Sequence, residues 1–299
     1  MKGIWNRETV RQGSEVTSGD GGNSNYLYTT SIVKDPRWNI GDAVVLSDGR
    51  VFRYALAGAG AAAVAGEASI QPEFGVCVPD KSITNAVAPT QTPQVNLPLG
   101  VNLSVGAVGD MAVRVTIGAT DGRSTTTPGT GTGLIAKDEL RGGYVVIGNG
   151  TGQHPQFRGI VGNDAVVVGG GSCLVFLDAP LIAQVLVGAT NIEAYLPLFG
   201  NVRNMNIVNS AYVTCLGFAA TPATYGQYFW VQTEGPVWGT SNSLTGEAAQ
   251  GRDIYINTDG SVRSASGTTY AGYQRIGTGM DLSAAGTSNG PCIWLNIGF

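Results

Sequence analysis

Short runs of β-branched and aromatic residues, each ended by glycine, proline or an Asp-Gly pair, recur along this 299-residue chain. The runs on either side of Asp48-Gly49 form a strong hairpin signal, and similar units recur at 251–263 and, more loosely, at 109–122. No segment has the apolar period of a long amphipathic helix, and glycines in the alanine-rich stretch 55–65 disfavour a helix there. The sequence therefore predicts an all-β protein, a β-sandwich or β-barrel of many short antiparallel strands.

The clearest strand runs from Tyr228 to Thr233, between Gly226 and the Gly235-Pro236 pair. Large apolar groups alternate onto both of its faces, which is typical of a strand covered on both sides. We expect Trp230 to be a core residue, although the aromatic residues at 225–238 could instead line a sugar-binding face. The predicted core aromatic side chains are Phe52, Tyr54, Trp230 and Trp294.

The N-terminal segment, 1–36, is rich in glycine, serine and asparagine and has no apolar period. Such a segment is either a flexible terminus or an arm that becomes ordered on a neighbouring surface. Its basic and aromatic residues suggest anchors for an arm, and the predicted interaction residues are Arg7, Arg11, Tyr26 and Tyr28.

Changes in composition divide the rest of the chain. A main β domain is expected at 37–222, with long loops at the proline-rich stretch 79–104 and the threonine- and glycine-rich stretch 123–133. A C-terminal β segment, 223–299, could be part of the same domain.

The chain is poor in charge, with 13% charged residues and a net charge of −4. A nucleic-acid-binding module would carry a basic face, so we expect no nucleic-acid partner. Depletion of charge is a property of protein–protein interfaces, which favours a subunit of an assembly. No run of about 18 apolar residues is present, so no membrane span is expected. The first residues lack the apolar core of a signal peptide, so synthesis in the cytoplasm is expected.

Residues that could carry chemistry are sparse. The one histidine, His154, precedes a proline and suggests a loop residue, and no G-x-S-x-G motif accompanies it. Asp138 and Glu139 are adjacent and would point to opposite faces of a strand, which makes a poor glycosidase pair. The four cysteines are widely spaced and suggest small buried side chains. We expect no enzymatic activity, no metal and no cofactor.

Three stretches resemble the virion structural proteins of tailed bacteriophages. Residues 228–236 read Y-F-W-V-Q-T-E-G-P, similar to the family's Y-x-W-V-Q-x-x-G-P segment. Residues 48–54, followed by an Ala/Gly stretch, resemble its D-G-x-x-F-R-Y…A-G opening, and 177–181 resemble its middle. These patches fall within residues 38–239, and they are structural motifs of moderate specificity.

The resemblance implies a non-enzymatic capsid decoration (cement) protein on the exterior of the virion, assembled in the host cytoplasm. Its expected partners are the phage major capsid protein and copies of itself, as a homotrimer. One alternative is a tail or fibre protein that binds host glycans. The major capsid protein is a second alternative, although proteins of that class resemble one another in having a long spine helix. A polysaccharide-degrading enzyme is a third.

Overall fold

The protein was analysed as a computed structural model. The structure describes residues 10–12, 24–58, 76–79, 83–87, 95–96, 102–103, 106–119, 132–148, 155–185, 191–204, 215–238, 241–243, 253–256, 262–264, 274–280 and 292–297. Within these ranges the regular secondary structure is nearly all strand, and the one helical element is a 3₁₀ turn, η2 (Ser24–Tyr28). The predicted all-β class is confirmed.

The chain divides into two compact units, with boundaries that differ from the predicted ones. Unit 1 comprises Met1–Pro79 and Val202–Phe299, and unit 2 comprises Asp80–Asn201. Strands β4 (Val76–Pro79) and β13 (Val202–Asn204) pair antiparallel, with Pro79 opposite Val202. Unit 2 is therefore an insertion whose two ends join unit 1 at neighbouring positions. The residues on both sides of the expected boundary between 222 and 223 belong to unit 1, as in the alternative that the segment 223–299 is part of the same domain.

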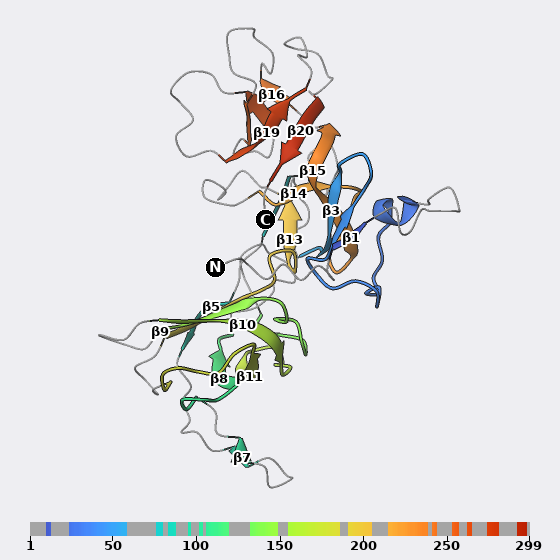
Figure 1. The fold of residues 1–299 in the computed structure, drawn as a ribbon. Coiled ribbons are helices and arrows are strands. Elements are labelled where there is room, and N and C mark those ends of the chain that lie inside the picture. Colours follow the sequence, from blue (N-terminus) through green and yellow to red (C-terminus); the bar gives the residue numbers. More distant parts are fainter. Residues whose placement is uncertain are drawn as a thin grey trace. The chain divides into compact units, whose positions relative to one another are not determined.

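A sheet of twelve strands dominates the part of unit 1 that the structure describes (Figure 1). Its order is β1-β2-β3-β15-β20-β19-β17-β18-β16, and β14, β4 and β13 branch from β15. Besides β4 and β13, its strands are β1 (Val10–Gln12), β2 (Ala43–Val45), β3 (Val51–Leu56), β14 (Gly217–Ala219), β15 (Tyr228–Trp238), β16 (Ser241–Ser243), β17 (Asp253–Ile256), β18 (Val262–Ser264), β19 (Arg275–Gly279) and β20 (Cys292–Asn296).

The long strand β15 is paired along both edges. One edge pairs with β3, and the other pairs first with β14 and then with β20. Gly217 allows the close approach of β14, because a Cβ there would lie 2.3 Å from the carbonyl oxygen of Gln232. The two faces of β15 are also covered, since Phe229, Trp230 and Val231 are all buried. Trp230 joins a cluster with Trp38, Phe52 and Tyr54.

Residues 24–36 differ from the predicted arm because they are packed into unit 1. Leu27 is fully buried, and Tyr26 packs on Trp38 and Trp230. Ser31 exchanges two backbone hydrogen bonds with Tyr228, which fixes this segment beside β15. Its apolar side chains therefore complete a core, which a free arm could not do. Residues 1–9 and 13–23 lie outside the described ranges.

Unit 2 contains a closed barrel of six strands, in the order β10-β11-β8-β5-β12-β9, with every pair antiparallel (Figure 1, green strands). The strands are β5 (Ile83–Val87), β8 (Ala112–Ile117), β9 (Tyr144–Gly148), β10 (Gln156–Asn163), β11 (Gly171–Leu177) and β12 (Asn191–Tyr195). Alternate residues, such as Val113 and Val115 of β8, fill the interior.

The stretch 79–104, predicted to be a long loop, contains strands where the structure describes it. It contains β5, and also β6 (Val95–Asn96) and β7 (Asn102–Leu103), which pair with each other. The prolines of this stretch suggested a loop, but β5 pairs with β8 and β12, which are distant in sequence. Of the second predicted loop, 123–133, the structure describes residues 132 and 133, which lie outside the strands.

Three of the four predicted core aromatic side chains, Phe52, Tyr54 and Trp230, are buried. Trp294 is not a core residue, because 43% of it is exposed and its ring lies against Gly49. Its neighbours Ile293 and Leu295 point into the core, so the alternation of β20 places Trp294 on the outer face.

Substitution of Trp230 and of Trp294 should lower the free energy of unfolding by different amounts. Trp230 is 2% exposed, and we expect Trp230→Ala to lower the free energy of unfolding by about 3–5 kcal/mol. Trp294→Ala should cost about 1 kcal/mol, because 43% of this residue is already exposed on the outer face of the sheet. Urea denaturation of both variants measures the difference. Equal losses would show that Trp230 is not the more important side chain of the two for stability.

Candidate interaction surface

The outer face of the barrel carries a patch of apolar side chains on β9, β10 and β12. Val145 and Ile147 of β9 point into the barrel, so Tyr144 and Val146 point outward. The register places Phe157 opposite Val146 and Tyr195 opposite Tyr144. We call Tyr144, Val146, Phe157 and Tyr195 the barrel patch. These residues come from three strands, and only the closed barrel brings them together.

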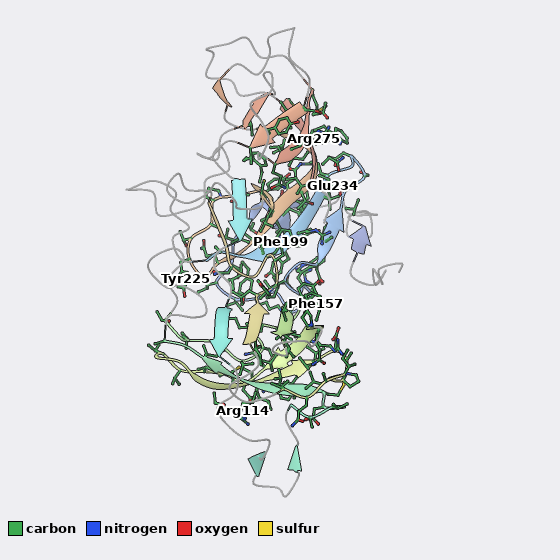
Figure 2. The ribbon with its side chains drawn as sticks, turned by 90° about the vertical axis from the view of Figure 1, so that its left-hand side faces the viewer. Arg114, Phe157, Phe199, Tyr225, Glu234 and Arg275 are labelled. Atoms are coloured by element: carbon green, nitrogen blue, oxygen red, sulfur yellow. The ribbon has the colours of Figure 1, made fainter. Side chains whose placement is uncertain are left out.

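Two members of the barrel patch form an exposed aromatic pair. The rings of Tyr144 and Phe157 are stacked, with centroids 5.1 Å apart and planes at 19°. They remain 48% and 58% exposed, respectively. Gly159 lies opposite Tyr144 in the register of β9 and β10. The backbone N–H of Gly159 donates a hydrogen bond to the carboxylate of Asp178. Figure 2 labels Phe157 and also Arg114 of β8 on this unit. Adjacent exposed aromatic rings, unlike isolated ones, indicate a contact surface.

Further apolar side chains are exposed on the loops of unit 2. Val167 and Val168 form the tip of the hairpin between β10 and β11, and they are 74% and 69% exposed. Val108 and Ile182 are exposed on two loops that are hydrogen-bonded to each other through Gly109 and Leu181. Single exposed apolar residues are common on proteins, so the stacked pair carries more weight than these loops.

Two buried amides hold the loops of the barrel in place. Gln156 accepts hydrogen bonds from the backbone N–H groups of Ile182 and Ala183, and donates to the carbonyl of Ala183. Asn163 accepts from the N–H of Leu140 at 2.8 Å and donates to the carbonyl of Ala136 at 2.9 Å. Both side chains are buried, and their polar groups are satisfied by these backbone partners.

Of the four predicted interaction residues, Tyr26 and Tyr28 are packed into unit 1. Arg7 lies outside the described residues, and Arg11 contributes backbone pairing in β1. Tyr26 faces the aromatic cluster of unit 1, and burial raises the pKa of its hydroxyl. Tyr28 is partly exposed, but its ring meets Phe52 edge-on and its hydroxyl accepts a hydrogen bond from Arg50. The two tyrosines therefore stabilise unit 1.

The alternative of a sugar-binding face on β15 is not supported by the burial of its aromatic residues. Phe229 and Trp230 are buried, and Tyr228 stacks on Tyr54 with centroids 5.6 Å apart. The side chain of Trp238 is outside the described part of the structure, and Tyr225 is the exposed aromatic residue next to this strand.

The polar groups singled out in the sequence serve local structure. Glu139 accepts a hydrogen bond from the N–H of Ala136, and Asp138 adopts a positive φ of 60° in the same turn. In the ranges that the structure describes, no three His, Cys, Asp or Glu side chains lie close enough to hold a metal ion. His154 is outside those ranges. No helix among the described residues is long and apolar enough to cross a membrane.

The ion pairs that the structure describes lie at the surface of unit 1. They join Arg37 to Asp35, Arg50 to Asp48 and Arg275 to Asp253. The hydrogen bonds from Arg37 lower the pKa of Asp35. Because exposed pairs contribute little to stability, these pairs shape local turns without holding the fold together.

Comparison of the chain with protein-family models, curated proteins and solved structures found no significant match.

The barrel patch was not predicted from the sequence. Tyr144 begins the run Y-V-V-I, which is typical of a strand, but Phe157 lies in a stretch without such a run. The pairing of the two residues depends on the register of β9 against β10.

Two buried cysteines should make stability depend on alkaline pH. Burial raises the pKa of the Cys173 thiol from 9.0 to about 11, and that of Cys215 to about 12. The folded protein keeps these protons where the unfolded chain loses them. The resulting contribution to stability is complete below pH 9 and declines as the pH rises toward the folded-state values. Urea unfolding between pH 8 and pH 10.5 should show this decline.

Alkylation provides an independent check of the same burial. With iodoacetamide at pH 8, Cys173 and Cys215 should react only after unfolding, since the thiolate is the reactive form. Peptide mass spectrometry identifies the labelled positions. Rapid labelling of either residue in the native protein would contradict its burial.

Proposed function

We propose that this chain is a non-enzymatic structural protein of a tailed-bacteriophage particle. Its role is that of a capsid decoration protein on the outside of the shell, where it binds the major capsid protein and copies of itself as a homotrimer. The resemblance at residues 48–54, 177–181 and 228–236 supports this proposal. The all-β fold and the low content of charged residues are compatible with it.

Two of the resembling stretches are neighbours in the fold. Residues 48–54 include most of β3, residues 228–236 include most of β15, and Trp230 lies directly opposite Tyr54. These motifs therefore describe the packing of unit 1. The surface that meets a partner in this proposal, the barrel patch, belongs to unit 2, whereas these two motifs belong to unit 1.

The observation that carries the proposal is the exposed Tyr144–Phe157 pair on the barrel patch. An aromatic side chain can bury roughly 150–250 Å², so two half-exposed rings offer about 200 Å². At about 25 cal/mol per Å², burial of that area contributes about 5 kcal/mol. Association itself costs about 4–15 kcal/mol, so one patch alone would bind weakly. Three linked copies would bind far more tightly through avidity, which favours a trimeric adhesive.

The copy number of the protein in purified particles tests its location. Quantitative mass spectrometry of virions should find it in numbers comparable with those of the major capsid protein. A copy number that is a small fraction of that of the major capsid protein would indicate a tail protein. Glycan binding is the alternative function at that location. Its absence from washed virions would exclude a structural role of either kind.

Removal of the aromatic pair should weaken binding to shells. We expect Tyr144→Ser with Phe157→Ser to reduce occupancy on particles assembled without this chain by at least about tenfold, equivalent to about 1.4 kcal/mol. Val167→Ser with Val168→Ser is the matched control, because it also removes two exposed apolar side chains from the barrel. Thermal melts establish that both variants remain folded. Equal occupancy of the aromatic variant and the control would exclude the barrel patch as the contact.

A further inference from the structure

The edge of the unit 1 sheet is formed by a short N-terminal strand. β1 pairs with β2 over three residues, with Val10 opposite Ala43, Arg11 opposite Val44 and Gln12 opposite Val45. The pairing is parallel, whereas β2 pairs antiparallel with β3 through the hairpin at Asp48-Gly49. No tight turn can connect parallel neighbours, so the position of β1 depends on the crossover chain that connects it to β2.

Most of that crossover is fixed to the body of unit 1. Leu27 and Trp38 are buried, and the backbone of Ser31 is hydrogen-bonded to Tyr228 in both directions. The anchored part begins at η2, whose first residue is Ser24. Only residues 13–23 separate this anchor from the end of β1. They include four glycines and no proline or aromatic residue.

The length of this connection allows β1 to reach more than one acceptor. Twelve chain steps from Gln12 to Ser24 span at most about 40 Å. That span is several times the spacing of about 4.8 Å between paired strands, so the connection does not by itself decide which copy of β2 receives β1. The same three residue pairs form whether β1 binds β2 of its own chain or β2 of another copy. Which of the two acceptors β1 binds therefore depends on the local concentration of neighbouring copies. Exchange of identical elements is a low-cost route to association for this reason.

We propose that β1 is an exchangeable strand, and that in the assembled protein β1 of one copy pairs with β2 of a neighbouring copy. The inference rests on the self-association in the proposed function, and it names the element that links the copies. A ring in which each copy donates its strand to the next closes at three members for a homotrimer. Each exchanged strand also covers the open edge of its acceptor sheet, which would otherwise be an aggregation site.

A pair of cysteines can report where β1 is bound. Gln12→Cys and Val45→Cys introduce thiols at paired positions, where the separation of Cα atoms in paired strands is compatible with a disulfide. The protein is first brought to its oligomeric state, established by light scattering, and then oxidised with oxidised glutathione. Denaturing, non-reducing electrophoresis separates the products. The single variants Gln12→Cys and Val45→Cys are the controls for the native cysteines.

Covalent trimers from the double variant, with monomers from both single variants, are the expected result. Covalent monomers with an internal disulfide, in a sample that light scattering finds to be trimeric, would overturn strand exchange but leave self-association intact. A monomer at every concentration would contradict both proposals. Covalent trimers from a single variant would show that the link does not report on β1, and would count against the exchange.

Deletion of residues 1–12 provides a second test that does not depend on disulfide formation. We expect the dissociation constant of the oligomer, measured by sedimentation, to rise at least tenfold relative to the full chain. The melting temperature of the dissociated protein should change little, since the deletion removes only the three-residue edge strand from the described sheet. An unchanged dissociation constant would overturn the proposal.

Discussion

The packing of β15 is the constraint on which unit 1 depends. This strand is hydrogen-bonded along both edges and buried on both faces, so it connects strands from both ends of the chain into one sheet. Its Trp230 meets Trp38 edge-on, with centroids 5.0 Å apart, and packs beside Tyr54. Through Trp38 and Leu27, the same cluster also holds the segment that precedes β2. Loss of this one strand would separate the N-terminal hairpin from the C-terminal strands.

The inserted barrel is stabilised differently from the sheet of unit 1. A closed barrel has no free strand edges, so the surface of the barrel offers side chains to a partner and few backbone groups. Its interior is filled by aliphatic side chains, and Gln156 and Asn163 satisfy backbone groups of the adjoining loops. Pro79 and Val202, which flank the inserted segment, are paired, so the insertion does not interrupt β15. Unit 1 therefore contains the sheet built around β15, and unit 2 carries the barrel patch.

The two proposed contacts are of different physical kinds. The barrel patch would act through burial of aromatic surface, which is strong per unit area but tolerant of partner geometry. The β1–β2 edge would act through backbone hydrogen bonds, which fix register and direction. An adhesive assembly benefits from both, because the first opposes detachment from a surface and the second defines the neighbour.

The sequence by itself determined the class of fold and the local elements. The hairpin at Asp48-Gly49 and the two-sided burial around Trp230 follow from a two-residue period and from turn chemistry, which act over a few residues. The tertiary structure decided which strands meet. It placed β5, in a proline-rich stretch, between β8 and β12, and it turned Leu27 from a supposed arm into a buried core residue. It also left Trp294 on the outer face of β20 and brought Tyr144 against Phe157, because long-range register decides which side chains face solvent together.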